Sequence, residues 1–305
     1  RAMAGDGDAK REESGPAAKR RKALASTRAT LHYQQVVPGK RVGRYINRED
    51  AGEVADVHDV REVDVHSARE LAQPPTLGTH CFELRRWPTQ VADFSDDKRV
   101  ADAYYKEMEG LVREATGAEK VIVFDHTVRN TTVAKLNSLH AGGASGAVMR
   151  VHTDYSDKSG PARLRTLAES GGYTGVKLSD AELKEFLARD FMIVNVWRSI
   201  SDEPIQTKPL AVLDESTLDQ SDFLPYEMHY PERVGENYSL TFNKRHMWYY
   251  YPRMVKDECL VFKTYESRKD VLRYCFHTAI DDPETREDAP PRRSVEVRCV
   301  AVMPR

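Results

Sequence analysis

The chain has 305 residues, with 31% charged and 40% hydrophobic side chains and a formal net charge of −2. That balance is typical of a soluble globular protein of one large or two small domains, and it gives no general attraction to nucleic acid or to an anionic membrane. No stretch approaches the roughly 18 apolar residues of a membrane span. The four cysteines form no CxxC pair, which disfavours zinc-ribbon and redox motifs and favours reduced thiols. We therefore expect a cytoplasmic protein without nucleic acid or membrane as a partner.

The first 27 residues, RAMAGDGDAKREESGPAAKRRKALAST, are small, polar and charged and show no apolar periodicity. Such a segment cannot bury enough apolar surface to offset the entropy that it loses on ordering. We therefore predict a disordered tail over residues 1–27 and a single domain over residues 28–305.

Two segments have the pattern of helices. Residues 99–117 carry apolar side chains near helical spacing and end at Gly117, a plausible C-terminal stop. Residues 179–190 open with Ser179, and Glu182 follows three residues later as in a capping box. Both segments are predicted to be helices.

Strand-like apolar runs are more numerous than helical ones, and they lie at 120–126, 146–152, 191–197, 208–214, 237–243, 247–251, 259–265 and 294–302. From residue 190 onward the chain is almost entirely short strands separated by Pro, Gly, Asn and Asp turns. This density predicts a sandwich or jelly roll, mainly β with flanking helices (α+β) contributed by the earlier part of the chain. A doubly wound parallel sheet fits poorly, because helices do not alternate with these strands.

A histidine and an aspartate stand two residues apart at the end of the run GAVMRVHTD. In an extended strand, residues i and i+2 point to the same face, so His152 and Asp154 are expected to project together. They form either a surface hydrogen-bonded pair or two arms of a metal site. Two histidines and one carboxylate form the facial triad that holds non-haem Fe(II) and leaves coordination positions open.

Three later histidines compete to be the third ligand. His229 lies in a turn bounded by Pro and Gly, which favours a surface role, and His246 stands among basic and aromatic residues without a partner at a useful spacing. His277 follows an apolar segment, and Arg292 and Ser294 come fifteen and seventeen residues later. An arginine and a hydroxyl on one strand face can hold a carboxylate. That pair is the anchor expected for a dicarboxylate cosubstrate whose other end chelates iron, so the ordered set favours His277.

Five other residues are weaker candidates for contacts with a substrate. Arg198 puts a cation at the end of an apolar strand, where a structural ion pair is an equal alternative. Asn195 shares strand parity with Trp197, and one of the two is expected to face the barrel interior, although an apolar core role is favoured for Trp197. His126 and Arg129 are candidates for a pocket mouth, although a satisfied structural histidine is as plausible. Tyr250 belongs to an aromatic run that alternates faces, for which a core role is the main alternative.

Several motifs occur together in a familiar order: FDHTVR (124–129), HTDYS (152–156), NVWRSI (195–200), KPLAVLD (208–214), MWYYYPRM (247–254), CLVFKTYES (259–267), FHTAIDDP (276–283) and PPRRSVEVR (290–298). As a set they resemble the hydroxylase/desaturase family of secondary metabolism, often described as related to gibberellin desaturase. That family also includes the bacterial protein that takes part in cephamycin 7α-methoxylation. The resemblance runs from about residue 29 to the C-terminus, and its specificity lies in the order of the motifs.

The resemblance implies a double-stranded β-helix (jelly-roll or cupin-like) core, Fe(II) and 2-oxoglutarate as cofactors, and O2 as a cosubstrate. The implied reaction is oxidation of an unactivated C–H bond of a small natural product or amino-acid-like molecule, by hydroxylation, desaturation or ring closure. Carried over by position, the implied iron ligands are His152, Asp154 and His277. Arg292 with Ser294 is the implied clamp on the distal carboxylate of 2-oxoglutarate, and Arg298, which has the same strand parity, is the competing clamp.

Two other classes of protein remain as alternatives. A cupin-like metalloenzyme would use the same barrel without 2-oxoglutarate, and succinate release during turnover would separate it from the main hypothesis. A non-catalytic binding protein would keep only the fold. The complete ligand set argues against the second alternative, because a degenerate member would be expected to have lost a ligand.

Overall fold

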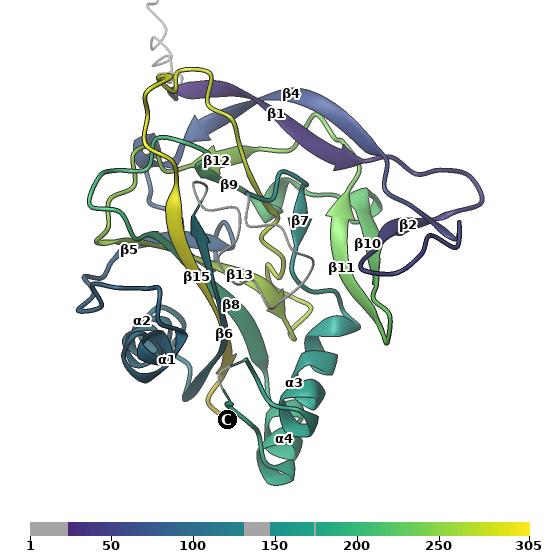
Figure 1. Ribbon diagram of the computed structural model, residues 1–305, viewed down its shortest axis with the longest axis vertical. Coiled ribbons are helices and arrows are strands. Elements are labelled where there is room, and N and C mark those ends of the chain that lie inside the picture. The colour runs from purple at the N-terminus through teal and green to yellow at the C-terminus, as the bar shows by residue number, and fades with distance from the viewer. Residues whose placement is uncertain (1–23, 131–146, 174) are drawn as a thin grey trace, which may run out of the picture.

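The computed structural model describes residues 24–130, 147–173 and 175–305. Over these residues the chain is mainly β, with helices packed on the flanks of two sheets (Figure 1). This confirms the predicted fold class. No helix in the described part of the chain is both long and apolar enough to cross a membrane.

Within the described ranges, the larger sheet has ten strands in the order β1 (Ser26–Gln34), β4 (His58–Ser67), β12 (Trp248–Tyr250), β9 (Leu210–Leu213), β14 (His277–Ala279), β7 (His152–Thr153), β11 (Val234–Leu240), β10 (Phe223–His229), β2 (Arg41–Tyr45) and β3 (Val54–Ala55). The smaller sheet has five strands in the order β5 (Phe82–Arg86), β13 (Glu258–Glu266), β8 (Phe191–Ser199), β15 (Arg293–Val302) and β6 (Lys120–Asn130). Most strand-like runs of the sequence form strands at their predicted positions, with ends that differ by a few residues.

The helices lie on the flanks of the sheets, and the sequence signals explain where two of them start or stop. α1 (Asp97–Arg99) runs through a π turn (Val100–Tyr104) into α2 (Tyr105–Thr116), which ends at Gly117 in the left-handed conformation. α4 (Asp180–Leu187) starts at the predicted capping box. Both predicted helices are therefore confirmed. α3 (Ser159–Glu169) was not predicted from the sequence.

Strand β8 shows how an apolar run becomes the centre of a sheet. All nine of its residues are buried, and it lies between β13 and β15. On its outer face, Val194 and Val196 share a core cluster with Met108 and Leu111 of α2. A strand that is covered on both faces needs a continuous apolar run instead of an alternating one.

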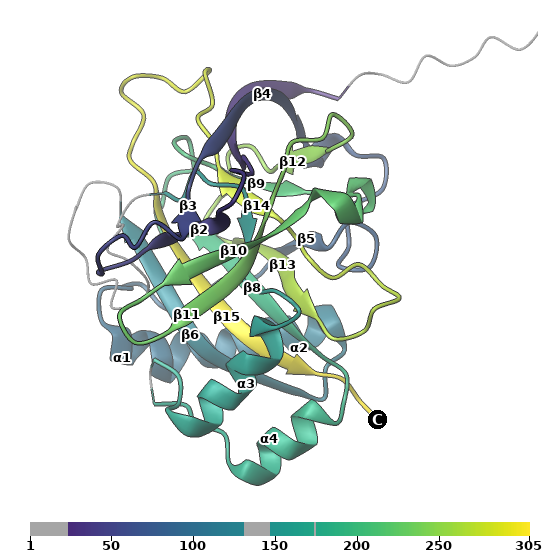
Figure 2. The same cartoon turned by 90° about the vertical axis from the view of Figure 1, so that its right-hand side faces the viewer.

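The two sheets pack face to face (Figure 2). The Thr153 hydroxyl of β7 donates a hydrogen bond to the carbonyl of Thr264 in β13 over 3.1 Å. The rings of Phe262 on β13 and His277 on β14 have their centroids 4.9 Å apart. Each strand of the smaller sheet therefore has an inner face toward the larger sheet and an outer face toward α2.

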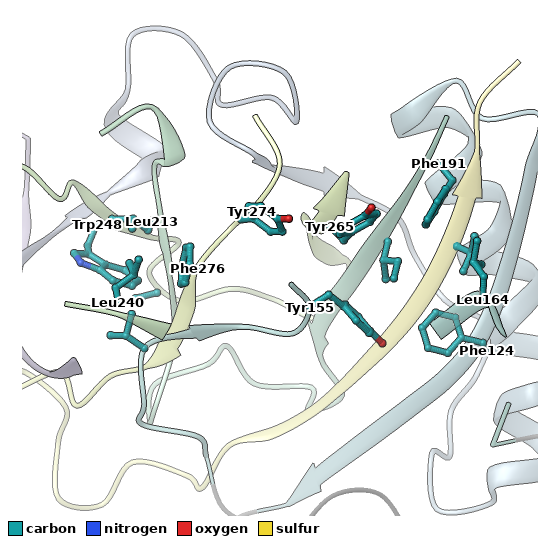
Figure 3. Close-up of a cluster of buried hydrophobic side chains, with 14 of the residues drawn as sticks. Phe124, Tyr155, Leu164, Phe191, Leu213, Leu240, Trp248, Tyr265, Tyr274 and Phe276 are labelled. Carbon is teal, nitrogen blue, oxygen red and sulfur yellow. The ribbon is translucent and has the colours of Figure 1, made fainter. Parts of the chain in front are cut away.

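One buried cluster joins the helical flank to the larger sheet (Figure 3). Phe124 of β6, Leu164 of α3 and Phe191 of β8 lie at one end of it, and Leu213 and Trp248 of the larger sheet lie at the other. Burying such side chains contributes about 1.5–3 kcal/mol each relative to leaving them exposed. This cluster therefore holds α3 and the smaller sheet against the larger sheet.

Two boundaries predicted from the sequence need correction. β1 begins at Ser26, inside the predicted tail, because the Thr27 hydroxyl bonds to Asp282 and the Ala25 amide to Glu70. Residues 1–23 lie outside the described residues, and the division into a tail and one domain stays a prediction. The strand predicted over 146–152 is short: among the described residues 147–153, only His152–Thr153 is a strand, because the backbone before it bonds to separate neighbours instead of one ladder.

Two helical glycines should respond oppositely to the same substitution. A Cβ at Gly160 in α3 would lie 2.5 Å from the ring of Tyr265, whereas a Cβ at Gly110 in α2 would lie 3.6 Å from Trp87. We expect Gly160→Ala to lower the free energy of unfolding by about 1–3 kcal/mol through overpacking. Gly110→Ala should raise it by about 0.5–1 kcal/mol, because glycine is costly within a helix. Urea denaturation measures both changes, and a stabilising Gly160→Ala would contradict the packing of α3.

Candidate metal centre

Two histidines face each other across neighbouring strands. His152 of β7 pairs directly with His277 of β14, and their ring centroids are 4.5 Å apart. Nδ1 of His152 donates to the carbonyl of Arg150 over 2.7 Å, and Nδ1 of His277 donates to the carbonyl of Cys275 over 3.1 Å. Because a carbonyl only accepts, each Nδ1 carries a proton, and in the neutral ring Nε2 then presents its lone pair.

Asp154 completes a cluster of three ligand atoms. Its Oδ1 lies 3.8 Å from Nε2 of His152 and 3.9 Å from Nε2 of His277. One ligand atom of each residue lies within 4.8 Å of the other two. Burial, above all other causes, holds the pKa of His152 well below its usual value, so this ring is neutral. Burial opposes ionisation of Asp154, but positive neighbours, above all Arg298, keep its pKa well below the usual range. A neutral His152 and an ionised Asp154 are in the protonation states in which such groups bind metals.

The second oxygen of Asp154 is held from the opposite sheet. Oδ2 accepts hydrogen bonds from Nδ2 of Asn195 over 2.8 Å and from Nε of Arg298 over 2.9 Å. The Asn195 side chain is itself fixed, because its Oδ1 accepts from the Thr264 hydroxyl over 3.3 Å. Asn195 was predicted as a substrate contact; the structure places it against Asp154, where it orients the carboxylate.

A row of charged and hydroxyl side chains follows the inner face of β15. Ser294 lies opposite Arg129 of β6, and its Oγ is buried without a hydrogen-bond partner. Arg292 is buried just before the strand, donates to the carbonyl of Lys208 over 2.6 Å, and lies 5.7 Å from the ring centre of Trp197. Burial, and then the positive charge of Arg129, lower the pKa of Arg292 to about 9. A bound anion would offset this concentration of positive charge.

Arg298, the competing clamp, donates hydrogen bonds from all three of its guanidinium nitrogens. Besides Nε on Asp154, its Nη1 bonds to Asp125 over 3.3 Å and Thr127 over 3.2 Å, and its Nη2 bonds to Glu296 over 2.6 Å. Sequence reasoning missed Asp125 and Glu296. A signal was present for Glu296, which shares the strand parity of Arg298, and Asp125 belongs to the motif FDHTVR.

Three predicted substrate contacts are not brought to this cluster. Arg198 lies opposite Val295 on the outer face of β8, where its guanidinium donates to the carbonyls of Trp87 and Lys256. His126 also faces outward, within hydrogen-bond distance of Tyr105 and Asp97.

Tyr250 points to the face opposite that of His277. Its neighbour Tyr249 pairs with Val212, which pairs with His277, so those three residues share one face. The two other histidines considered as a third ligand have partners elsewhere. His229 contacts Glu227, and His246 contacts Tyr33 and Asp222.

Facing sheets with two buried imidazoles and a carboxylate between them define a mainly β protein with a candidate metal centre. The family model described as "Oxidoreductase/YMDC permease-like domain" matches residues 31–302. The Fe(II)/2-oxoglutarate-dependent dioxygenase nvfI of Aspergillus novofumigatus is 30% identical over 247 residues, which is 78% of this chain and 82% of the relative. The alpha-ketoglutarate-dependent dioxygenase tstK of Talaromyces stipitatus is 29% identical, over 74% of this chain and 79% of the relative.

A solved structure titled as the iron and alpha-ketoglutarate-dependent endoperoxidase NvfI covers 92% of this chain and 99% of its own, with a TM-score of 0.77 and 24% identity. It shows the same fold. The chain belongs to the family of Fe(II)/2-oxoglutarate-dependent dioxygenases, so it is an oxidoreductase with Fe(II) and 2-oxoglutarate as cofactors. This confirms the resemblance seen in the sequence and sets aside both alternative classes.

The placement of Arg198 can be tested by removing its guanidinium. Arg198→Met leaves two partly buried carbonyls without this donor, so we expect the free energy of unfolding to fall by about 1–3 kcal/mol. The Kd for 2-oxoglutarate should stay unchanged. Urea denaturation and a binding titration measure the two effects, and weaker cosubstrate binding at unchanged stability would contradict the structural role.

Proposed function

We propose that His152, Asp154 and His277 hold the Fe(II) of a dioxygenase that oxidises an unactivated C–H bond of a small natural product. One observation carries the proposal: one ligand atom of each residue lies within 4.8 Å of the others, and both histidines are buried. The names of the relatives support the reaction class, since they include a hydroxylase/desaturase from Hormonema carpetanum. Hydroxylation, desaturation and ring closure are the outcomes to be distinguished by product analysis.

The residues fit a non-haem Fe(II) ion. Two imidazoles and one carboxylate are the donor set of the facial triad, which leaves positions open for other ligands. The Nδ1 protons of His152 and His277 are already donated to backbone carbonyls, and Oδ2 of Asp154 is already occupied by two donors. The remaining donor atoms converge. When bound, iron supplies the activation of dioxygen that no side chain can provide.

The residues also fit the distal carboxylate of 2-oxoglutarate. We assign its clamp to Arg292 and Ser294, supported by the buried Ser294 Oγ that has no partner in the described structure. Arg129 lies directly opposite Ser294 and adds positive charge to the same place. Arg298 is a weaker choice, because each of its three nitrogens already contacts another side chain.

The protein itself orients the metal ligands and excludes water from the centre. Phe262 contacts the ring of His277, while Val212 lies beside it in strand register and Trp197 belongs to the same buried cluster. An apolar wall of this kind excludes water and strengthens the electrostatic contacts of the centre. We also propose a cytoplasmic location, supported by four cysteines that are all free and buried.

The iron assignment predicts a spectroscopic result. Anaerobic addition of Fe(II) and 2-oxoglutarate to the wild-type protein should produce a metal-to-ligand charge-transfer absorbance band. His152→Ala and Asp154→Ala should abolish the band, because each removes a ligand atom. His229→Ala, which removes a histidine that contacts Glu227 instead, is the matched control and should keep the band. A normal band in both ligand variants would place the iron elsewhere.

The clamp assignment predicts a separate effect on the cosubstrate. Arg292→Lys loses the paired charge-assisted bonds of a guanidinium, so the Kd for 2-oxoglutarate should rise about 10- to 100-fold. Ser294→Ala should raise it less, by about 3- to 10-fold. Fe(II) affinity measured without 2-oxoglutarate should not change. Calorimetric titration decides the point, and an unchanged Kd in Arg292→Lys would return the assignment to Arg298.

A further inference from the structure

Arg298 joins three carboxylates that come from three parts of the chain. Its Nε contacts Asp154 at 2.9 Å, its Nη1 contacts Asp125 of β6 at 3.3 Å, and its Nη2 contacts Glu296 of β15 at 2.6 Å. Each of the three guanidinium nitrogens therefore contacts a carboxylate, and a planar group held in this way has little freedom to rotate. The direction of the Nε–H bond is set by Asp125 and Glu296, and that bond points at Asp154.

Asp125 is a costly residue if its role is stability alone. Its side chain is buried, and within the described residues only Oδ2 has a hydrogen-bond partner, whereas Oδ1 has none. It lines a cavity of about 290 Å³ together with Phe124, Arg163, Gly171, Gly172 and Tyr173. Burying a carboxylate that keeps an oxygen unsatisfied opposes folding, so such a group calls for a functional explanation. Among the described residues, Asp125 forms its ion pair with Arg298.

We propose that Arg298 is a positioning residue that turns Asp154 toward the metal, and that Asp125 and Glu296 hold Arg298 in the orientation this requires. The inference rests on the proposed function, in which Asp154 is an iron ligand. Arg298 and Asn195 both donate to Oδ2, so the carboxylate presents Oδ1 to the histidines. Partners of this kind change metal affinity by about 10- to 100-fold when they are removed.

Two substitutions separate this role from direct ligation. Asp125→Asn keeps the shape of the side chain but removes the charge that holds Nη1, and it touches no proposed metal ligand. Arg298→Lys keeps a positive charge near Asp154 but cannot bridge Asp154 and Asp125, because an ammonium group lacks the fork of a guanidinium. If Arg298→Lys fails to fold, Asp125→Asn and Glu296→Gln test the positioning role of Arg298, because each removes the charge of one of its partners.

The experiment measures Fe(II) affinity by anaerobic calorimetry without 2-oxoglutarate, and the visible spectrum of the Co(II)-substituted protein as a report on ligand geometry. We expect Asp125→Asn to weaken Fe(II) binding about 10-fold and Arg298→Lys up to about 100-fold, each with an altered Co(II) spectrum. Glu258→Gln is the matched control, since it removes the charge of a carboxylate that contacts Arg69 at 2.7 Å outside this cluster. It should leave both readouts unchanged.

The outcomes separate a failure of the proposed function from a failure of the positioning role of Arg298. A wild-type protein that binds neither Fe(II) nor 2-oxoglutarate would overturn the proposed function itself. A wild-type protein that binds both, with Asp125→Asn and Arg298→Lys variants that keep its Fe(II) affinity and its Co(II) spectrum, would overturn the positioning role alone. A lower melting temperature without a change in the spectrum would likewise show that these residues serve stability only.

Discussion

The carboxylate of Asp154 joins the two sheets of this protein through hydrogen bonds. Asp154 follows a strand of the larger sheet, yet its Oδ2 is held by Asn195 and Arg298 of the smaller one. Its Oδ1 then faces two histidines whose strands are direct neighbours. The geometry of the centre therefore depends on how the sheets pack, because a shift between them would turn the carboxylate away from the imidazoles.

Charge along the inner face of β15 divides the site into two parts. At one end, Arg298 is surrounded by carboxylates and is electrostatically satisfied. At the other end, Arg292 is buried near Arg129, with Glu296 as the nearby negative charge. A bound anion would attract the positive charges of Arg292 and Arg129 there, whereas beside Arg298 it would meet three carboxylates. The proposed positioning residue Arg298 and the proposed carboxylate clamp Arg292 thus lie in and just before one strand, β15.

Local patterns in the sequence were sufficient for the strongly apolar strands, for the capped helices and for the spacing of His152 and Asp154. They failed where the pattern was weak: β4 is mostly polar and half-exposed, and α3 has no capping side chain at its start. They also failed for the faces of β8. Both faces of that strand are buried, so no polar–apolar alternation shows that Asn195 faces the centre while Arg198 faces α2. Only the packing of a second sheet on one side decides that point.

The partners of the centre are far apart in the chain, and this distance has a physical consequence. His152 and His277 are neighbours only through strand pairing, and Asp125 reaches Arg298 only across β6 and β15. The unfolded chain therefore does not hold the donor atoms together, whereas the folded chain presents them as one cluster. A metal that binds the folded state alone stabilises it through mass action. Metal binding and the assembly of the two sheets are thus thermodynamically linked, and the contacts that orient Asp154 are the structural route by which one can favour the other.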